Sequence, residues 1–211
     1  MTGTAVRQAV IAEEETVARL LATVFDELPL HRWLVPTPER HPEIFPHFFQ
    51  ILVGHALRHG TVYVTEDLRA AAVWLPMPSP DIEDYDDRLS AACQDHVERF
   101  HQLDEAMGQA YPADRGDHDH LAFLVVHPDL QGDGIGSHLL RLHHDILDRA
   151  CRPAYLEATS PASRKLYLRH GYADLGRPLA LPFDPEAMYP MWRPAQSEAA
   201  QRGATHGEAS S

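Results

Sequence analysis

The stretch that decides the fold is VVHPDLQGDGIGSHLL, residues Val125 to Leu140, in which glycines at alternate positions separate an apolar run from an amphipathic pattern. The run LAFLVV, Leu121–Val126, has strand length and predicts a central strand that is covered on both faces. Beyond the glycines, apolar residues from Ile135 to Leu147 recur at helical spacing. The stretch therefore predicts a strand, a glycine loop and a helix in succession.

A glycine loop at a helix N-terminus is suited to bind an anion, because unpaired N–H groups and the helix dipole converge there. Gly132, Gly134 and Gly136 let the backbone approach an anion closely. A Walker A loop is excluded, since no lysine follows the glycines. A Rossmann loop is poorly matched, because the spacing is G-x-G-x-G and HPDLQ lies between strand and glycines, although Glu157 stands near the position of a ribose-binding acid.

The 211 residues are enough for one domain, expected over residues 1–194, with a disordered tail over 195–211. Helical periodicity predicts helices over Glu13–Leu28, from Phe45 to near Gly60, over Leu89–Met107, from Ile135 to Leu147, and up to Gly171. Strands are expected at TVYVTED, AAAVWLP, LAFLVV and AYLEAT, with two more before Pro194. The alternation predicts an α/β (α+β) domain with a mixed central sheet flanked by helices.

The net charge of −13 disfavours a nucleic-acid partner. The acidic stretch Asp81–Phe100 is either a solvated helix face or a surface for a cationic partner. No run is long enough to span a membrane, no signal peptide is apparent, and Cys93 and Cys151 are expected to be free thiols, which together predict a cytoplasmic protein. The tract Asp117–His120 (DHDH) lacks metal-ligand spacing, and no metal is expected.

Two motifs carry a family resemblance. The pattern Val126-x-Pro128-x-x-Gln131-x-x-Gly134-x-Gly136 resembles the acetyl-CoA signature of the GCN5-related N-acetyltransferases (GNAT superfamily), and LYLRHGY, Leu166–Tyr172, resembles its second signature. The resemblance implies a strand that splays from its neighbour and pairs with the pantetheine arm, followed by a loop that holds the pyrophosphate. The implied cofactor-binding residues are Leu124, Val125, Val126, Gln131, Gly132, Asp133, Gly134, Ile135, Gly136 and Ser137.

Within the superfamily, AAAVWLP, the acidic insert and AYLEATSPASRKLYLRHGY resemble the puromycin N-acetyltransferase type, whose members modify antibiotics. One position departs from the family pattern. An asparagine that commonly bonds the pantetheine is absent, and Ser160 and Ser163 are the nearest candidates for this contact.

Acetyl transfer to an amine requires a neutral amine, a donor to the oxyanion and a proton or dipole for the thiolate. Glu157 is the only acid in the apolar strand AYLEAT, and it is either the general base or a carboxylate that orients the substrate. The resemblance implies that Tyr167 is the general acid, with a core tyrosine as the alternative. Trp74 is either an aromatic wall for the substrate or a core residue.

The predicted function is acetyl-CoA-dependent N-acetyl transfer to a small amine, such as an antibiotic or a biosynthetic intermediate. The alternatives are acetylation of a protein N-terminus or lysine, and a non-catalytic acyl-CoA sensor. The expected partners are acetyl-CoA and the amine, without nucleic acid or membrane, in a monomer or homodimer.

Overall fold

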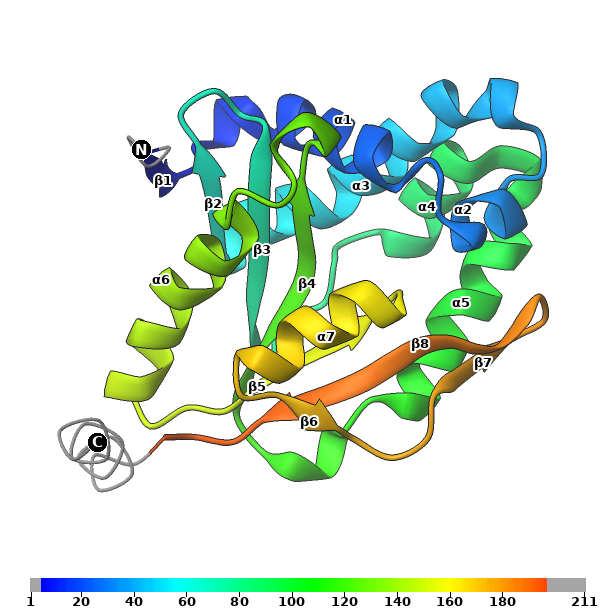
Figure 1. The fold of residues 1–211 in the computed structure, drawn as a ribbon. Coiled ribbons are helices and arrows are strands. Elements are labelled where there is room, and N and C mark those ends of the chain that lie inside the picture. Colours follow the sequence, from blue (N-terminus) through cyan, green and yellow to red (C-terminus); the bar gives the residue numbers. More distant parts are fainter. Residues whose placement is uncertain (1–4, 197–211) are drawn as a thin grey trace, which may run out of the picture.

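The structure, a computed structural model, describes residues 5–196, apart from the side chains of 185–187. An eight-stranded sheet has the order β1-β2-β3-β4-β5-β8-β6, and β7 pairs with β8 (Figure 1). The strands β4 and β5 run parallel, and the other pairs among the described residues are antiparallel. Their bounds are β1 (Val6–Gln8), β2 (Thr61–Thr65), β3 (Ala70–Met77), β4 (His118–Val126), β5 (Ala154–Ala158), β6 (Ala173–Asp174), β7 (Leu179–Leu181) and β8 (Asp184–Arg193).

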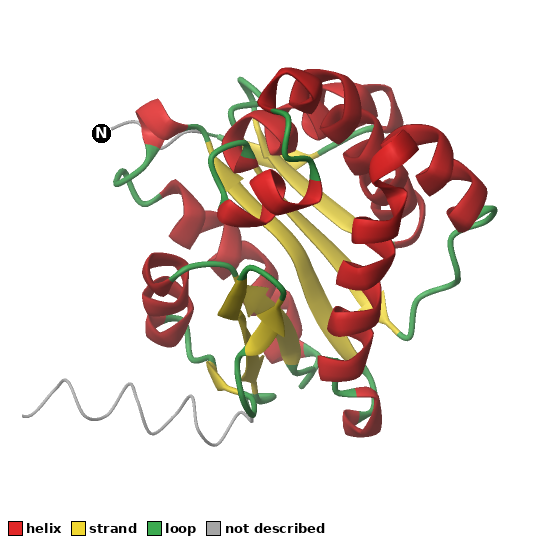
Figure 2. Cartoon of the chain, turned by 90° about the vertical axis from the view of Figure 1, so that its right-hand side faces the viewer, coloured by secondary structure: helices red, strands yellow, loops and turns green. Residues whose placement is uncertain are grey.

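Helices cover both faces of this mixed sheet, as predicted (Figure 2). The helices are α1 (Glu14–Phe25), α2 (Pro29–Leu34), α3 (His41–His59), α4 (Tyr85–Cys93), α5 (Val97–Ala110), α6 (Ile135–Arg149) and α7 (Pro161–Arg169). The first five pack on one face through one hydrophobic cluster, and α6 and α7 pack on the other face through a second cluster. The predicted tail lies almost wholly outside the described residues.

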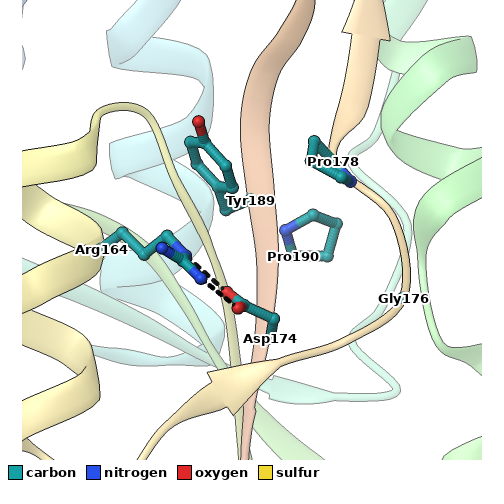
Figure 3. A pocket seen from close by; sticks show the side chains of 6 residues that line it. All are labelled: Arg164, Asp174, Gly176, Pro178, Tyr189 and Pro190. Atoms are coloured by element: carbon teal, nitrogen blue, oxygen red, sulfur yellow. Dashed lines mark hydrogen bonds and ion pairs between the residues drawn. The ribbon is translucent and has the colours of Figure 1, made fainter.

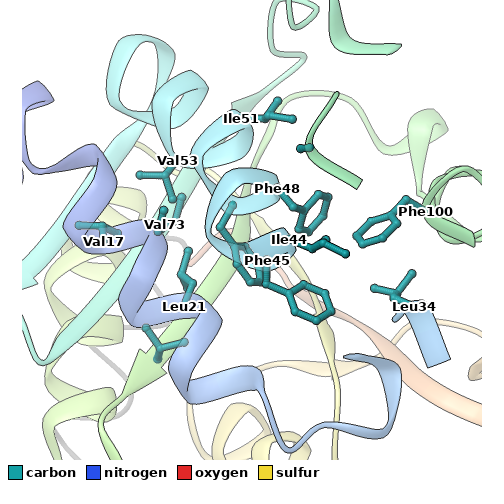
Figure 4. Close-up of a cluster of buried hydrophobic side chains, with 14 of the residues drawn as sticks. Val17, Leu21, Leu34, Ile44, Phe45, Phe48, Ile51, Val53, Val73 and Phe100 are labelled. Carbon is teal, nitrogen blue, oxygen red and sulfur yellow. The ribbon is translucent and has the colours of Figure 1, made fainter. Parts of the chain in front are cut away.

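The first cluster forms because α1 and α3 each present one apolar stripe to the sheet. Val17 and Leu21 of α1 meet Phe45 and Val53 of α3 over Val73 of β3 (Figure 4). Among these five side chains the largest exposed fraction is 1%. The cluster therefore fixes the position of β3, and through β3 that of β4, which carries the candidate site.

Several element boundaries differ from those expected. The single helix predicted over Leu89–Met107 is two helices, α4 and α5, because Gln94 takes a non-helical conformation with a positive φ of 52°. The first helix ends at Phe25, and Pro29 begins the separate helix α2. The short edge strand β1 was not predicted, and β4 begins at His118 rather than Leu121.

The central strands separate partway along their length. Asp119 pairs with Ala154 and His120 with Tyr155, and the parallel ladder between β4 and β5 ends there. The strand β4 continues to Val126, paired with β3 along its other edge. The predicted splayed strand is therefore confirmed, and the gap between β4 and β5 has its vertex at His120.

Among residues 5–196, no helix is both long and apolar enough to cross a bilayer.

His31 makes stability depend on pH. Its ring stacks on Phe45 at 3.9 Å, and burial lowers its pKa to about 3. Between about pH 6.5 and pH 3 the unfolded chain therefore binds a proton that the folded chain does not, so stability falls as the pH falls. The resulting loss between pH 7 and pH 5 is about 2 kcal/mol.

His31→Phe retains the stacked ring and removes this titration. We expect the difference in unfolding free energy between pH 7 and pH 5, measured with urea, to be about 2 kcal/mol smaller in the variant. His47→Phe, at an exposed position of α3, is the control and should retain the wild-type difference. Equal pH dependence in His31→Phe and the wild type would contradict the assignment.

Candidate active site

The free edge of β4 presents backbone groups to the gap. The N–H of His127 donates to the Arg69 carbonyl at 2.8 Å, and Val126 lies opposite Ala70 in the antiparallel register. Because hydrogen-bonded and non-hydrogen-bonded pairs alternate, the N–H and C=O groups of Val126 and Leu124 point away from β3. The gap therefore offers main-chain donors and acceptors where a pantetheine arm is expected.

The loop after β4 is shaped by its glutamine and its glycines. A turn over Pro128–Leu130 follows the strand, and the Gln131 side-chain amide donates to the Val126 carbonyl at 3.0 Å. Gly132 and Gly134 have φ values of 93° and 81°, a region that favours glycine. A Cβ at either position would have open space around it. Backbone conformation, rather than crowding within the chain, therefore requires these two glycines.

The N-terminus of α6 completes an anion cradle. The first helical hydrogen bond runs from the His138 N–H to the Gly134 carbonyl. The N–H groups of Ile135, Gly136 and Ser137 therefore lie outside the helical ladder, at the positive end of the helix dipole. Their geometry suits a pyrophosphate.

Gly136 of α6 lies close to side chains of both β4 and α7. A Cβ built there would lie 3.7 Å from Val126 Cγ2, 3.8 Å from Leu124 Cδ2 and 3.9 Å from Leu166 Cδ2. The strand β4, the helix α6 and the helix α7 therefore converge at this residue, and a side chain larger than a methyl group would push them apart.

The other predicted cofactor residues differ in their surroundings. Val125 is buried on the α1 and α3 face of β4, whereas the Asp133 residue is exposed. The Ser137 hydroxyl is hydrogen-bonded to His170 Nε2 at 2.9 Å. Ser160 and Ser163 form the capping box of α7, in which the Ser163 N–H donates to the Ser160 hydroxyl at 3.1 Å. Both serine hydroxyls therefore have a structural role, and their predicted contact with pantetheine stays a prediction.

Tyr167 is the buried residue of α7. Its side chain belongs to the same cluster as Leu124 and Val126, and the residue is 7% exposed. Burial raises the pKa of its phenol well above the ordinary value. The phenol therefore keeps its proton at neutral pH and can donate a hydrogen bond.

Glu157 stands at the vertex of the gap with a partner that was not predicted. Its Oε2 lies 2.9 Å from His120 Nε2, and the two side chains are 6% and 14% exposed. Tyr155 packs against His120 at a ring-centroid distance of 5.3 Å. Burial and the neighbouring Glu157 carboxylate raise the pKa of the Tyr155 phenol. A carboxylate, an imidazole and a phenol are therefore gathered where the strands part.

A second histidine, His118, lies next to these three side chains and is hydrogen-bonded to Tyr111. The Tyr111 hydroxyl lies 2.7 Å from His118 Nε2, and His118 Nδ1 lies 2.7 Å from the Gly116 carbonyl. Since a carbonyl only accepts, His118 carries its proton on Nδ1 and accepts from Tyr111 at Nε2. Burial and Glu157 raise the pKa of Tyr111 to about 12, so its hydroxyl remains a donor.

Trp74 is not presented to a substrate. The residue is 0% exposed, and its ring stacks on His143 of α6 at 4.2 Å. The aromatic wall predicted here requires an accessible ring, so the core interpretation applies.

The DHDH tract is divided between the two faces of β4. Asp119 accepts from Arg152 Nε at 2.9 Å and is hydrogen-bonded to His143 on the α6 face. His118 and His120 face the Glu157 side. Within the described part of the chain, no group of three or more His, Cys, Asp or Glu residues is arranged to hold a metal ion.

A separate cleft of about 350 Å³ lies on the other flank of α7 (Figure 3). The Arg164 guanidinium donates to both carboxylate oxygens of Asp174 and lies over the Tyr189 ring at 5.2 Å. The remaining lining residues are Gly176, Pro178 and Pro190. None of the predicted cofactor or catalytic residues lines this cleft.

The sequence analysis did not predict His120 because it placed the start of this strand at Leu121, and Tyr111 lies outside any strand, after α5. The signal was present, since His118 and His120 alternate on one strand as Tyr155 and Glu157 do on its neighbour. Residues two apart on a strand share a face. A strand that begins at His118 places His120 beside Glu157.

A parallel strand pair that separates beside a glycine-capped helix, with a buried tyrosine on the next helix, is the arrangement that the family resemblance implies. Residues 95–174 match the family model of the acetyltransferase (GNAT) domain. The predicted resemblance to the GNAT superfamily is therefore confirmed, over the segment that carries β4, the loop, α6, β5 and α7.

A segment of 53 residues is 42% identical to an uncharacterized N-acetyltransferase of Schizosaccharomyces pombe. It covers 25% of this chain and 22% of that protein, so the chain matches about a fifth of the length of this relative. The similarity is therefore confined to part of both proteins.

Solved structures share the fold over most of the chain. A structure from Corynebacterium glutamicum, described as histone acetyltransferase HPA2 and related acetyltransferase, is 24% identical with a TM-score of 0.67, covering 90% of this chain and 95% of that chain. Arylalkylamine N-acetyltransferase 2 from Aedes aegypti is 16% identical with a TM-score of 0.65, covering 91% and 99%. At these identities the similarity concerns the fold, and the puromycin-type resemblance stays a prediction.

Proposed function

We propose that this protein is an acetyl-CoA-dependent N-acetyltransferase that acetylates the amine of a small molecule, from a single domain spanning residues 1–194. The observation that carries the proposal is the gap between β4 and β5. Backbone groups of Leu124 and Val126 line it, the α6 N-terminus lies at its open end, and Glu157 lies at its vertex. The two free thiols agree with a reducing compartment, and a cytoplasmic location is part of the proposal.

Leu124 and Val126 would bind the pantetheine, and residues 132–137 would bind the pyrophosphate through their N–H groups. When bound, acetyl-CoA supplies the activated acetyl group. Glu157 removes a proton from the incoming ammonium, so that the neutral nitrogen can form the C–N bond as the C–S bond breaks. A main-chain N–H of β4 that points into the gap stabilises the oxyanion, and the Tyr167 hydroxyl donates to the departing thiolate. In total, an ammonium and a thioester yield an amide, a thiol and one proton.

The acceptor class is tested by incubating the protein with acetyl-CoA and a panel of amines, while free thiol and product mass are followed. The panel contains arylalkylamines, diamines, aminoglycoside and nucleoside antibiotics, and basic peptides. Thiol release coupled to acetylation of a small amine is expected. Turnover with peptides only would support protein acetylation instead, and binding without thiol release would support the sensor.

Asp133 lowers the affinity for the cofactor, because its charge stands beside the phosphate cradle. We expect Asp133→Lys to tighten acetyl-CoA binding by about 3- to 10-fold at low salt, and by less above 0.3 M salt. Titration calorimetry at two salt concentrations measures this. Asp145→Lys changes net charge equally, but it lies on α6 about 15 Å beyond the cradle and should have a smaller effect. Equal effects of both substitutions, or none, would contradict a local role.

A further inference from the structure

We infer that His120 is a positioning residue for the acetyl transfer, which holds the Glu157 carboxylate at the vertex of the gap and takes the proton that Glu157 removes from the amine. The inference rests on the proposed function.

The position of His120 is fixed by the sheet. It is the last residue of β4 that pairs with β5, and Glu157 follows its partner Tyr155 by two residues on the same face. Where the ladder ends, an arm lying between the strands can advance no further, so its terminal acyl group is brought to this pair. His120 is therefore placed by backbone hydrogen bonds and not by a mobile loop.

The contact between His120 and Glu157 is a direct hydrogen bond. The Nε2–Oε2 distance of 2.9 Å is that of a direct hydrogen bond, and the imidazole is the carboxylate's ion-pair partner when protonated. The groups that face His120 are Glu157 and Tyr155 on β5, Tyr111 after α5, and His118 on its own strand. The two phenols keep their protons, as their raised pKa values require. Among these groups, the His120 imidazole is thus the one whose free ring nitrogen can accept a proton from Glu157.

The unequal burial of Glu157 and His120 sets the direction in which a proton passes between them. The Glu157 side chain is 6% exposed, and the His120 side chain is 14% exposed. A carboxylic acid that is nearly closed to water returns its proton slowly by itself, whereas the imidazole is the more open of the two groups. After the ammonium loses its proton to Glu157, that proton passes to His120 and then to solvent. Glu157 is restored as a carboxylate for the next turnover.

The test compares His120→Gln, His120→Phe and the wild type with an acceptor that the protein acetylates. Glutamine can donate to Glu157 but cannot take a proton, and phenylalanine can do neither. We expect kcat to fall about 10-fold in His120→Gln and about 100-fold in His120→Phe, with the KM for acetyl-CoA within about two-fold. His47→Gln, on the exposed side of α3, is the control and should match the wild type.

Two readouts separate proton transfer from a structural role. The pH–rate profile of His120→Gln should differ in shape from that of the wild type, and added imidazole should accelerate this variant but not the wild type. A profile that is merely scaled, without rescue by imidazole, would overturn the inference and leave the proposed function intact. A wild-type protein that binds acetyl-CoA but acetylates no amine would overturn the proposed function, and the inference with it.

Discussion

Replacing Tyr167 by phenylalanine is expected to lower kcat for acetyl transfer by about 100-fold, while the Kd for acetyl-CoA changes by less than two-fold. The ring is buried in the cluster against which Leu124 and Val126 pack, and the substitution retains that packing. It removes only the hydroxyl, whose proton is held by a raised pKa. Since a lasting tyrosinate is unfavourable here, the hydroxyl acts as a hydrogen-bond donor to the sulfur, and any proton that it gives must be replaced within the same step.

Tyr172→Phe is the matched control for this variant. Tyr172 is buried in the same cluster, its ring lies 5.8 Å from Tyr167, and its hydroxyl is hydrogen-bonded to His144 at 3.0 Å. Loss of that hydroxyl should affect folding stability by about 1 kcal/mol and leave kcat within about two-fold. Similar kcat values for both variants would remove Tyr167 from the proposed role and favour a core tyrosine.

Replacing Glu157 by glutamine is expected to lower kcat/KM for the amine by about 100- to 1000-fold at pH 7. Glutamine has the same shape and can remain hydrogen-bonded to His120, but it cannot take a proton. The remaining rate should rise with pH up to the pKa of the amine acceptor, because the amine must then lose its proton in solution. Steady-state kinetics from pH 6 to pH 10 measure both effects.

Glu105→Gln, at an exposed position of α5, is the control for the change of charge. It should retain the wild-type rate and pH profile. If Glu157→Gln lowers the rate without altering the profile, Glu157 orients the substrate or a water molecule, which is the alternative left open by the sequence. An unchanged rate would exclude both roles.

The sequence predicts the cofactor half of the site well because local chemistry determines it. Glycines at 132 and 134 are required by backbone conformation, and the amphipathic pattern from Ile135 fixes where the helix begins. Such features depend on neighbours in the chain, so periodicity and motif spacing reveal them. The splayed β4 followed from the family resemblance and agrees with the register.

The acceptor half depends on which strands meet, and the sequence does not contain that pairing explicitly. His120 and Glu157 are 37 residues apart and come together only through the short parallel ladder. For Trp74 the sequence left open an aromatic wall or a core residue, and the choice depends on His143 of α6, which stacks on its ring. The break at Gln94 could not be predicted for another reason, since a single residue with positive φ interrupts a helix without altering the apolar period.

The central claim is that coenzyme A lies between β4 and β5 with its sulfur near Tyr167 and the acceptor nitrogen near Glu157. A crystal structure with coenzyme A and an acetylated amine tests it most directly. We expect the pyrophosphate on the N–H groups of residues 132–137, the pantetheine against Leu124 and Val126, and the product nitrogen within direct or one-water reach of Glu157. Coenzyme A bound outside this gap, for example in the cleft beside Arg164 and Tyr189, or a product nitrogen remote from Glu157, would contradict the claim.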